Sequence, residues 1–221
     1  MRGEVAKLIE SYQTLCYIGE KDGKTIITGN VLVHKVYNDF PVYKEFCVKI
    51  EIPHNYSETL PEVWEIGNQI EDSYQHRYSD GKLCLAADSE MKIDFLKGVS
   101  LTEWVEKYII AYFFSYEYYK RFGEYPFGER SHGSLGTLEF YSSYFGIDDV
   151  VKTYKFMEKL RSLKYRGHDK CPCGSEKKAR NCHGTIIIDL FRTGAINIVS
   201  QDFLAISTEV NEMVRGARKN G

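Results

Sequence analysis

The sequence contains few prolines and no long apolar run. Five prolines are spread over 221 residues without any low-complexity stretch, so we expect no long linker. The longest uninterrupted apolar stretch is Tyr108–Phe114, far shorter than the roughly 20 residues that cross a bilayer. We therefore expect no membrane segment. The first residues include Glu4 and begin an amphipathic pattern instead of an apolar signal core, which predicts a cytoplasmic protein.

The remaining composition is that of a folded protein, but its charge is unevenly distributed. The chain is 43% apolar and contains 29 Lys and Arg against 31 Asp and Glu. A chain of this length supports one large core, or one core with a small satellite. The segment 151–183 contains ten basic and three acidic residues, which gives it a net charge of +7 and leaves −9 for the rest. This division predicts two surfaces with different partners.

The period of the apolar residues changes along the chain and predicts an α+β fold, with an N-terminal helix, an antiparallel β-meander and later helices. The turn dipeptide Asp22-Gly23 precedes the first long alternating run, and Ser100 or Thr102 is a suitable N-cap for the central helix. The expected elements are, in chain order, a helix over 5–12, strands over 25–36, 43–52 and 63–66, helices over 101–122 and 148–167, a strand over 186–190 and a helix over 203–214.

Four side chains of metal-binding types cluster near the C-terminus. Segment 171–184 reads CPCGSEKKARNCHG. It supplies three thiols and one imidazole, which suit tetrahedral Zn²⁺, from Cys171, Cys173, Cys182 and His183. Because these four ligands would fill the coordination shell, we expect the zinc to be structural and not catalytic.

This string closely resembles the SEC-C motif, a small zinc knuckle, and departs from it mainly at Glu176, where the family usually has glycine. The resemblance places a knuckle at 170–184. We therefore expect a body over 1–146 and a second part over 147–221, made of a basic helix, the knuckle and a C-terminal extension.

The remaining cysteines are Cys16, Cys47 and Cys84. We expect the first two to be core residues because they lack ligand spacing and polar neighbours. By composition alone Cys84, which lies between two leucines, is also a candidate for a buried small hydrophobe.

The context of Cys84 suggests a second interpretation. The order of helix, meander, a segment bounded by Pro53 and Pro61, then His76 and the string DGKLCL over 80–85, resembles the ubiquitin-conjugating enzymes over roughly residues 1–125. That resemblance implies a conjugating-like fold and a transferase in which Cys84 accepts the C-terminus of a ubiquitin-like protein as a thioester.

The match departs from the family at the site itself. The usual His-Pro-Asn precedes the cysteine by about ten residues, whereas His76 precedes Cys84 by eight and is followed by Arg77 and Tyr78. The asparagine that stabilises the oxyanion is therefore missing. Tyr78, Ser79 or a residue from elsewhere has to replace it, or the activity differs.

A zinc knuckle after such a domain is similar to the conjugating-like protein of short type II CBASS anti-phage operons. That resemblance implies a cGAS/DncV-like nucleotidyltransferase as partner, whose C-terminus would be transferred to a protein acceptor in antiviral defence. The chain has no glycine-rich nucleotide loop, so either another protein activates the carboxyl group or the partner's C-terminus reaches Cys84 by another route. His132 is the candidate base or positioning residue, His76 is a second one, and Asp88 is either a helper for an incoming lysine or an exposed loop acid.

Two other functions remain open. A conjugating-like domain without the asparagine is also compatible with a non-catalytic adaptor that binds the same partner. The +7 segment and its zinc knuckle are compatible with contact to nucleic acid or ribosomes, which we rank third because the segment has few aromatic residues for base stacking. The tyrosines at helical spacing over 108–119 predict core packing more than a partner groove.

Overall fold

A computed structural model of the chain describes residues 2–56 and 58–219, which form two compact units. Unit 1 contains the described residues up to Ala86 together with Gly98–Glu129. Unit 2 contains Ala87–Lys97 and the described residues from Arg130 onward. The predicted boundary between residues 146 and 147 falls inside unit 2.

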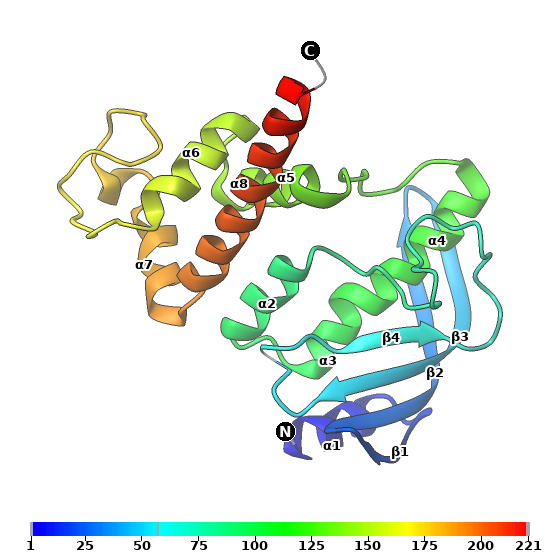
Figure 1. Cartoon of the computed structure of the whole chain (residues 1–221). Coiled ribbons are helices and arrows are strands. Elements are labelled where there is room, and N and C mark those ends of the chain that lie inside the picture. The colour runs from blue at the N-terminus through cyan, green and yellow to red at the C-terminus, as the bar shows by residue number, and fades with distance from the viewer. Residues whose placement is uncertain (1, 57, 220–221) are drawn as a thin grey trace. The chain divides into compact units, whose positions relative to one another are not determined.

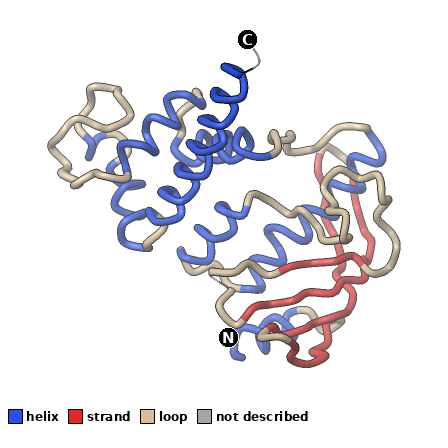
Figure 2. Tube along the Cα trace, viewed as in Figure 1, coloured by secondary structure: helices blue, strands red, loops and turns tan. Residues whose placement is uncertain are grey.

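Unit 1 is an α+β unit built on a four-stranded antiparallel sheet in the order β1-β2-β3-β4 (Figures 1 and 2). The predicted meander is therefore confirmed, with an additional first strand. Its elements are α1 (Arg2–Ser11), β1 (Leu15–Lys21), β2 (Lys24–Tyr37), β3 (Phe40–Pro53), β4 (Glu62–Glu65), α3 (Leu101–Trp104), a π-helical turn (Val105–Ile110) and α4 (Ala111–Phe122).

The sheet of unit 1 is buried on one face only, as its alternating sequence requires. In the register of β2 and β3, Ile27 faces Ile50 and Val31 faces Phe46, and all four side chains are buried. The tyrosine-rich segment continues this core, because Phe113 stacks on Phe46 with ring centroids 4.2 Å apart. Of the predicted stripe, Tyr108, Tyr112 and Tyr116 are buried as the packing role requires, whereas Tyr119 is half-buried and its neighbour Tyr118 is buried.

The central helix begins where the sequence predicts. Ser100 is the N-cap, and it forms a reciprocal capping box with Glu103. The helix ends at Gly123, which has a left-handed backbone with φ of +73°.

Unit 2 is helical within the residues described. Its elements are α2 (Asp88–Leu96), α5 (Gly133–Phe145), α6 (Val150–Leu160), a 3₁₀ turn (Ala179–Asn181), α7 (Gly184–Thr193) and α8 (Ile196–Lys219). Helix α2 is tied to this unit by a shared carboxylate: Ser89 Oγ donates to Asp202 Oδ2 at 2.5 Å, and the Tyr141 hydroxyl donates to the same oxygen at 2.6 Å.

The structure corrects three predictions. Residues 186–190 belong to α7 and not to a strand, because the amide of Ile187 bonds the His183 carbonyl and the helix buries Ile187 and Leu190 in the core of unit 2. This packing overrides the strand preference of consecutive isoleucines. Cys16 is exposed and not a core residue, because alternation along β1 points Leu15 inward and Cys16 outward. The helix expected over 148–167 ends at Leu160.

Candidate metal centre and cysteine site

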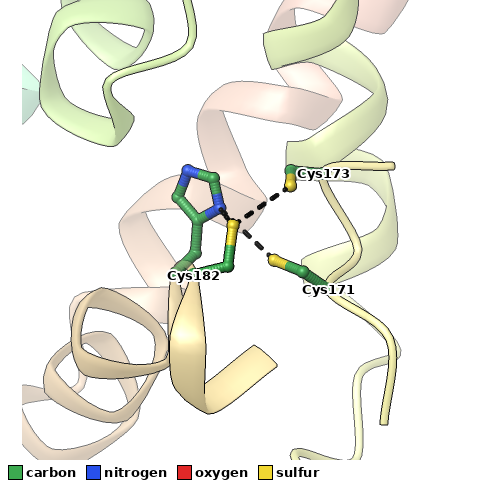
Figure 3. A group of neighbouring side chains, drawn as sticks. Cys171, Cys173 and Cys182 are labelled. Atoms are coloured by element: carbon green, nitrogen blue, oxygen red, sulfur yellow. Dashed lines mark hydrogen bonds between the residues drawn. The ribbon is translucent and has the colours of Figure 1, made fainter. Parts of the chain in front are cut away.

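The four predicted zinc ligands meet in unit 2. The ligand atoms of Cys171, Cys173, Cys182 and His183 all lie within 4.8 Å of one another. Sγ of Cys182 lies 3.6 Å from Sγ of Cys173 and 3.1 Å from Nδ1 of His183 (Figure 3), and Sγ of Cys171 lies 3.3 Å from the same nitrogen. Three sulfurs and one ring nitrogen therefore converge on one point.

The chain reaches this geometry through two tight turns and a short antiparallel pairing. The amide of Cys171 bonds the Lys177 carbonyl at 2.8 Å, and Lys170 pairs with Lys178 in an isolated bridge. Gly174 and Glu176 have left-handed backbones, with φ of +84° and +62°. The position where the SEC-C motif usually has glycine is thus one where the backbone favours glycine.

The imidazole is oriented by a carbonyl behind it. Nε2 of His183 lies 3.0 Å from the carbonyl oxygen of Phe145, the last residue of α5. Since a carbonyl only accepts hydrogen bonds, this contact assigns the ring proton to Nε2 and leaves Nδ1 with a free lone pair toward the sulfurs. Such an outer hydrogen bond is common behind metal-bound histidines.

The thiols of the cluster differ in acidity in the absence of metal. Burial raises the pKa of Cys171 to about 11. Burial also raises the pKa of Cys173, but hydrogen bonds from Ser175 and from the neighbouring cysteines outweigh it and lower the pKa to about 6. A bound divalent cation would deprotonate all three thiols. The donor set therefore fits a soft or borderline metal ion.

Comparison with known families identifies this cluster. The model of the SEC-C motif matches residues 169–185, which include all four ligands. The predicted motif is confirmed on this short segment, which is too small a part of the chain to assign the whole to a family. No curated protein and no solved structure matches the chain. Among the described residues, no helix is long and apolar enough to cross a membrane.

Cys84 lies in unit 1, at the end of a small hairpin attached to the edge of the sheet. Arg77 pairs with Leu83, and the Leu83 amide bonds the carbonyl of Val63 in β4 at 2.8 Å. Lys82 continues this attachment by pairing with Trp64. The hairpin therefore extends the sheet beyond β4. Cys84 lies at the edge of this extension, and its side chain is half-buried.

One carbonyl oxygen holds the backbone of Cys84 in place. The His76 carbonyl accepts the amide of Cys84 at 2.8 Å and the hydroxyl of Tyr112 at 3.0 Å. Burial raises the pKa of Tyr112, and the neighbouring Cys84 raises it further. The hydroxyl of Tyr112 therefore shares the His76 carbonyl with the Cys84 amide and remains protonated. The helical spacing of the tyrosines predicts only a core role for Tyr112.

The side chain of His76 faces an acidic and aromatic environment. Its Nε2 lies 3.5 Å from Oε1 of Glu129. The rings of Tyr74 and Tyr125 contact it edge-on, with centroids 5.5 Å and 5.0 Å away. Glu129 was missed because it is far from His76 in sequence and belongs to no recognisable motif.

The structure brings Cys84 and His76 together but assigns His132 to the other unit. His132 is the residue before the first turn of α5, and Asp88 is the first residue of α2, also in unit 2. Tyr78 is exposed, and the ammonium of Lys82 lies 4.9 Å from its ring centroid. The roles predicted for His132, Asp88 and Tyr78 in catalysis stay predictions.

Proposed function

We propose that this protein is a ubiquitin-conjugating-like acyltransferase that carries the C-terminus of a partner protein as a thioester on Cys84. The proposal rests on one observation above all: the order of α1, the four-stranded meander, the Cys84 hairpin and the long helix in unit 1 is the order that the sequence resemblance implies. The backbone of Cys84 is fixed while its side chain is only half-buried, as a nucleophile requires.

The chemistry proceeds in two acyl transfers. The Cys84 thiolate attacks the carbonyl carbon of a carboxyl group that another protein has adenylated, a C–S bond forms and AMP leaves. An acceptor amine or thiol then attacks the thioester carbonyl, and Cys84 leaves as a thiolate. In the amine case the lost proton passes to a base, for which His76, in the same unit as Cys84, is the proposed residue.

The partner and the setting follow from the resemblance alone. We propose a cGAS/DncV-like nucleotidyltransferase as the protein whose C-terminus is carried, a second protein as acceptor, and a cytoplasmic role in anti-phage defence. The metal proposed for the SEC-C cluster is Zn²⁺, held by three thiolates and Nδ1 of His183 in a structural role.

Intact mass spectrometry of the full chain, co-expressed with the nucleotidyltransferase and the activating protein, tests this function. We expect an adduct of the partner's mass on the wild type that a reducing agent removes. Cys84→Ser should trap an oxyester that resists thiols, and Cys84→Ala should form no adduct. Cys16→Ala is the matched control, because Cys16 is the exposed cysteine of the same unit.

Two results would contradict the proposal. An adduct that persists in Cys84→Ala, or the absence of any adduct on the wild type, rules out the thioester at this residue. If Cys84→Ala in addition keeps full partner binding and full defence in cells, the protein is the non-catalytic adaptor.

A further inference from the structure

A row of lysines follows the solvent face of α6 in unit 2. Lys152, Lys155 and Lys159 are exposed and lie at positions i, i+3 and i+7, which share one face of a helix. The opposite face packs into the core of unit 2 through Thr153, Phe156, Met157 and Leu160. Because that face is buried, the three lysines must point toward solvent. The row is about 10 Å long at 1.5 Å per residue.

One hydrogen bond links the end of this row to the zinc knuckle. The ammonium of Lys159 donates to the carbonyl of Pro172 at 3.0 Å, which joins the end of α6 to the ligand loop. Within the knuckle, Lys170 pairs with Lys178 in the isolated antiparallel bridge. The exposed cations beyond α6 are Arg161, Lys164, Arg166, Lys170, Lys177, Lys178 and Arg180. We call these residues and the α6 row the basic surface.

Most cations of the basic surface form no ion pair, although Asp149 at the N-cap of α6 is near enough to Lys152 and Lys155 for their charges to help lower its carboxyl pKa. Lys170 pairs with Glu176. Lys152, Lys155, Lys164, Lys177 and Lys178 make no ion pair within the part of the chain that the structure describes. Clustered cations without ion pairs repel one another and destabilise the folded unit. A bound polyanion lowers this repulsion.

We propose that the basic surface binds the phosphate backbone of double-stranded nucleic acid without reading its sequence. A duplex carries about one charge per 1.7 Å of its axis, and lysines that neutralise phosphates release the counterions condensed on it. The aromatic residues of 150–183 offer no stacking platform, because Phe156 is fully buried and Tyr154 and Tyr165 are partly covered. Single-strand binding normally depends on such platforms. This activity is independent of Cys84 and lies beyond the proposed acyl transfer.

Fluorescence anisotropy with the zinc-loaded full chain and a labelled 20-base-pair DNA duplex of mixed sequence tests the proposal. For about six phosphate contacts we expect log K to fall with log salt concentration with a slope of about −5 between 50 and 200 mM KCl. Replacing Lys152, Lys155, Lys177 and Lys178 by alanine should reduce the slope to about −2, since each phosphate contact contributes about −0.9. Scrambling the duplex sequence should leave the affinity unchanged.

The control removes the same type of charge from the other unit. Lys7→Ala with Lys21→Ala, both exposed residues of unit 1, should bind the duplex like the wild type, and so should Cys84→Ala. Zinc content and the thermal unfolding curve of the fourfold variant must match the wild type, which shows that any loss comes from charge and not from unfolding.

Three outcomes would overturn the proposal. The first is that the wild type does not bind the duplex at 50 mM KCl. The second is that the fourfold variant binds the duplex as tightly as the Lys7 and Lys21 control. The third is that a single strand of the same sequence binds more tightly than the duplex. Vesicles containing anionic lipid serve as a second probe, and tighter binding to them than to the duplex would assign the basic surface to a membrane instead.

Discussion

The two cysteine sites of this protein are built in opposite ways. The SEC-C cluster takes all its ligands from thirteen consecutive residues, and hydrogen bonds within the same segment shape the loop. The Cys84 site is assembled from distant parts of unit 1: the hairpin itself, β4 through Val63, and α4 through Tyr112. The ligands of the first site are therefore local in sequence, with one orienting contact from Phe145 of α5, whereas the second site depends on contacts across its whole unit. The two sites should therefore respond differently to the same perturbation.

Both tryptophans of the chain belong to unit 1, so the two units can be followed separately. Trp104 is fully buried, and Trp64 lies on β4 with the ammonium of Lys49 4.0 Å from its ring centroid. Tryptophan fluorescence therefore reports the unfolding of unit 1. The metal content and the helical circular dichroism signal report mainly on unit 2.

Loss of the metal is the largest expected effect and should affect one unit only. Chelation, or Cys171→Ser, should remove the proposed zinc ion and destabilise unit 2, by about 4 kcal/mol if free zinc is about 1,000 times its Kd, because an ion bound only by the folded state stabilises that state. Cys171 is also part of the buried core of that unit. We expect an earlier helical transition by circular dichroism with an unchanged tryptophan transition. Cys16→Ser should change neither, and equal shifts of both transitions would contradict the independence of the two units.

Removing the hydroxyl of Tyr112 should have the second-largest effect, on the stability of unit 1. Tyr112→Phe deletes a buried donor and should destabilise this unit by about 1–2 kcal/mol in tryptophan-monitored urea unfolding. Because that hydroxyl bonds the carbonyl that also holds Cys84, the rate of Cys84 alkylation by iodoacetamide should change severalfold, measured on the Cys84 peptide by mass spectrometry.

Tyr116→Phe is the matched control for this experiment. Tyr116 lies one turn further along α4, is equally buried, and its hydroxyl accepts the amide of Glu71 instead. We expect a similar loss of stability with unchanged alkylation of Cys84. If both variants change the alkylation rate equally, Tyr112 has no specific role at the thiol.

These contrasts explain which features the sequence could reveal. The ligand cluster was predicted residue by residue because its spacing is local and its chemistry is distinctive. Tyr112 and Glu129 approach the Cys84 hairpin only after the chain has folded, so no local pattern marks them. Helix α5 was missed for a different reason: its sequence contains glycines, and Gly136 is required there because a Cβ would lie 1.8 Å from the Ser131 carbonyl oxygen. Such a close contact requires glycine, which has a low helix propensity, so propensity alone does not predict a helix there.

Acid should weaken the attachment of the Cys84 hairpin. Lys24 bonds both Glu51 and Glu62, and Glu62 also bonds Lys82 of the hairpin. Burial raises the pKa of each carboxyl group, but the bonds from these lysines and Lys49 outweigh it and the pKa values are lowered. A depressed carboxyl pKa gives stability that is present above the unfolded value and lost as pH falls through the folded one.

The tryptophan transition should therefore move to lower urea as pH falls from about 5 to 3, and Glu62→Gln should cost about 1 kcal/mol at pH 7 and flatten this dependence. Glu58→Gln, an exposed glutamate nearby in sequence, is the control and should retain the full pH dependence. An unaltered pH profile in Glu62→Gln would show that the network does not anchor the hairpin.

The smallest effect concerns Glu176, the main position at which the sequence resemblance to the SEC-C motif fails. Glu176 has a left-handed backbone, where glycine is unstrained and a residue with a Cβ is not. Its ion pair with Lys170 is exposed and contributes little. Glu176→Gly should thus be more stable than Glu176→Ala by about 0.5 kcal/mol, measured as the midpoint of the helical transition with zinc bound. Tryptophan fluorescence should not distinguish the two variants. If Glu176→Ala is the more stable variant, backbone strain does not explain the motif's preference for glycine.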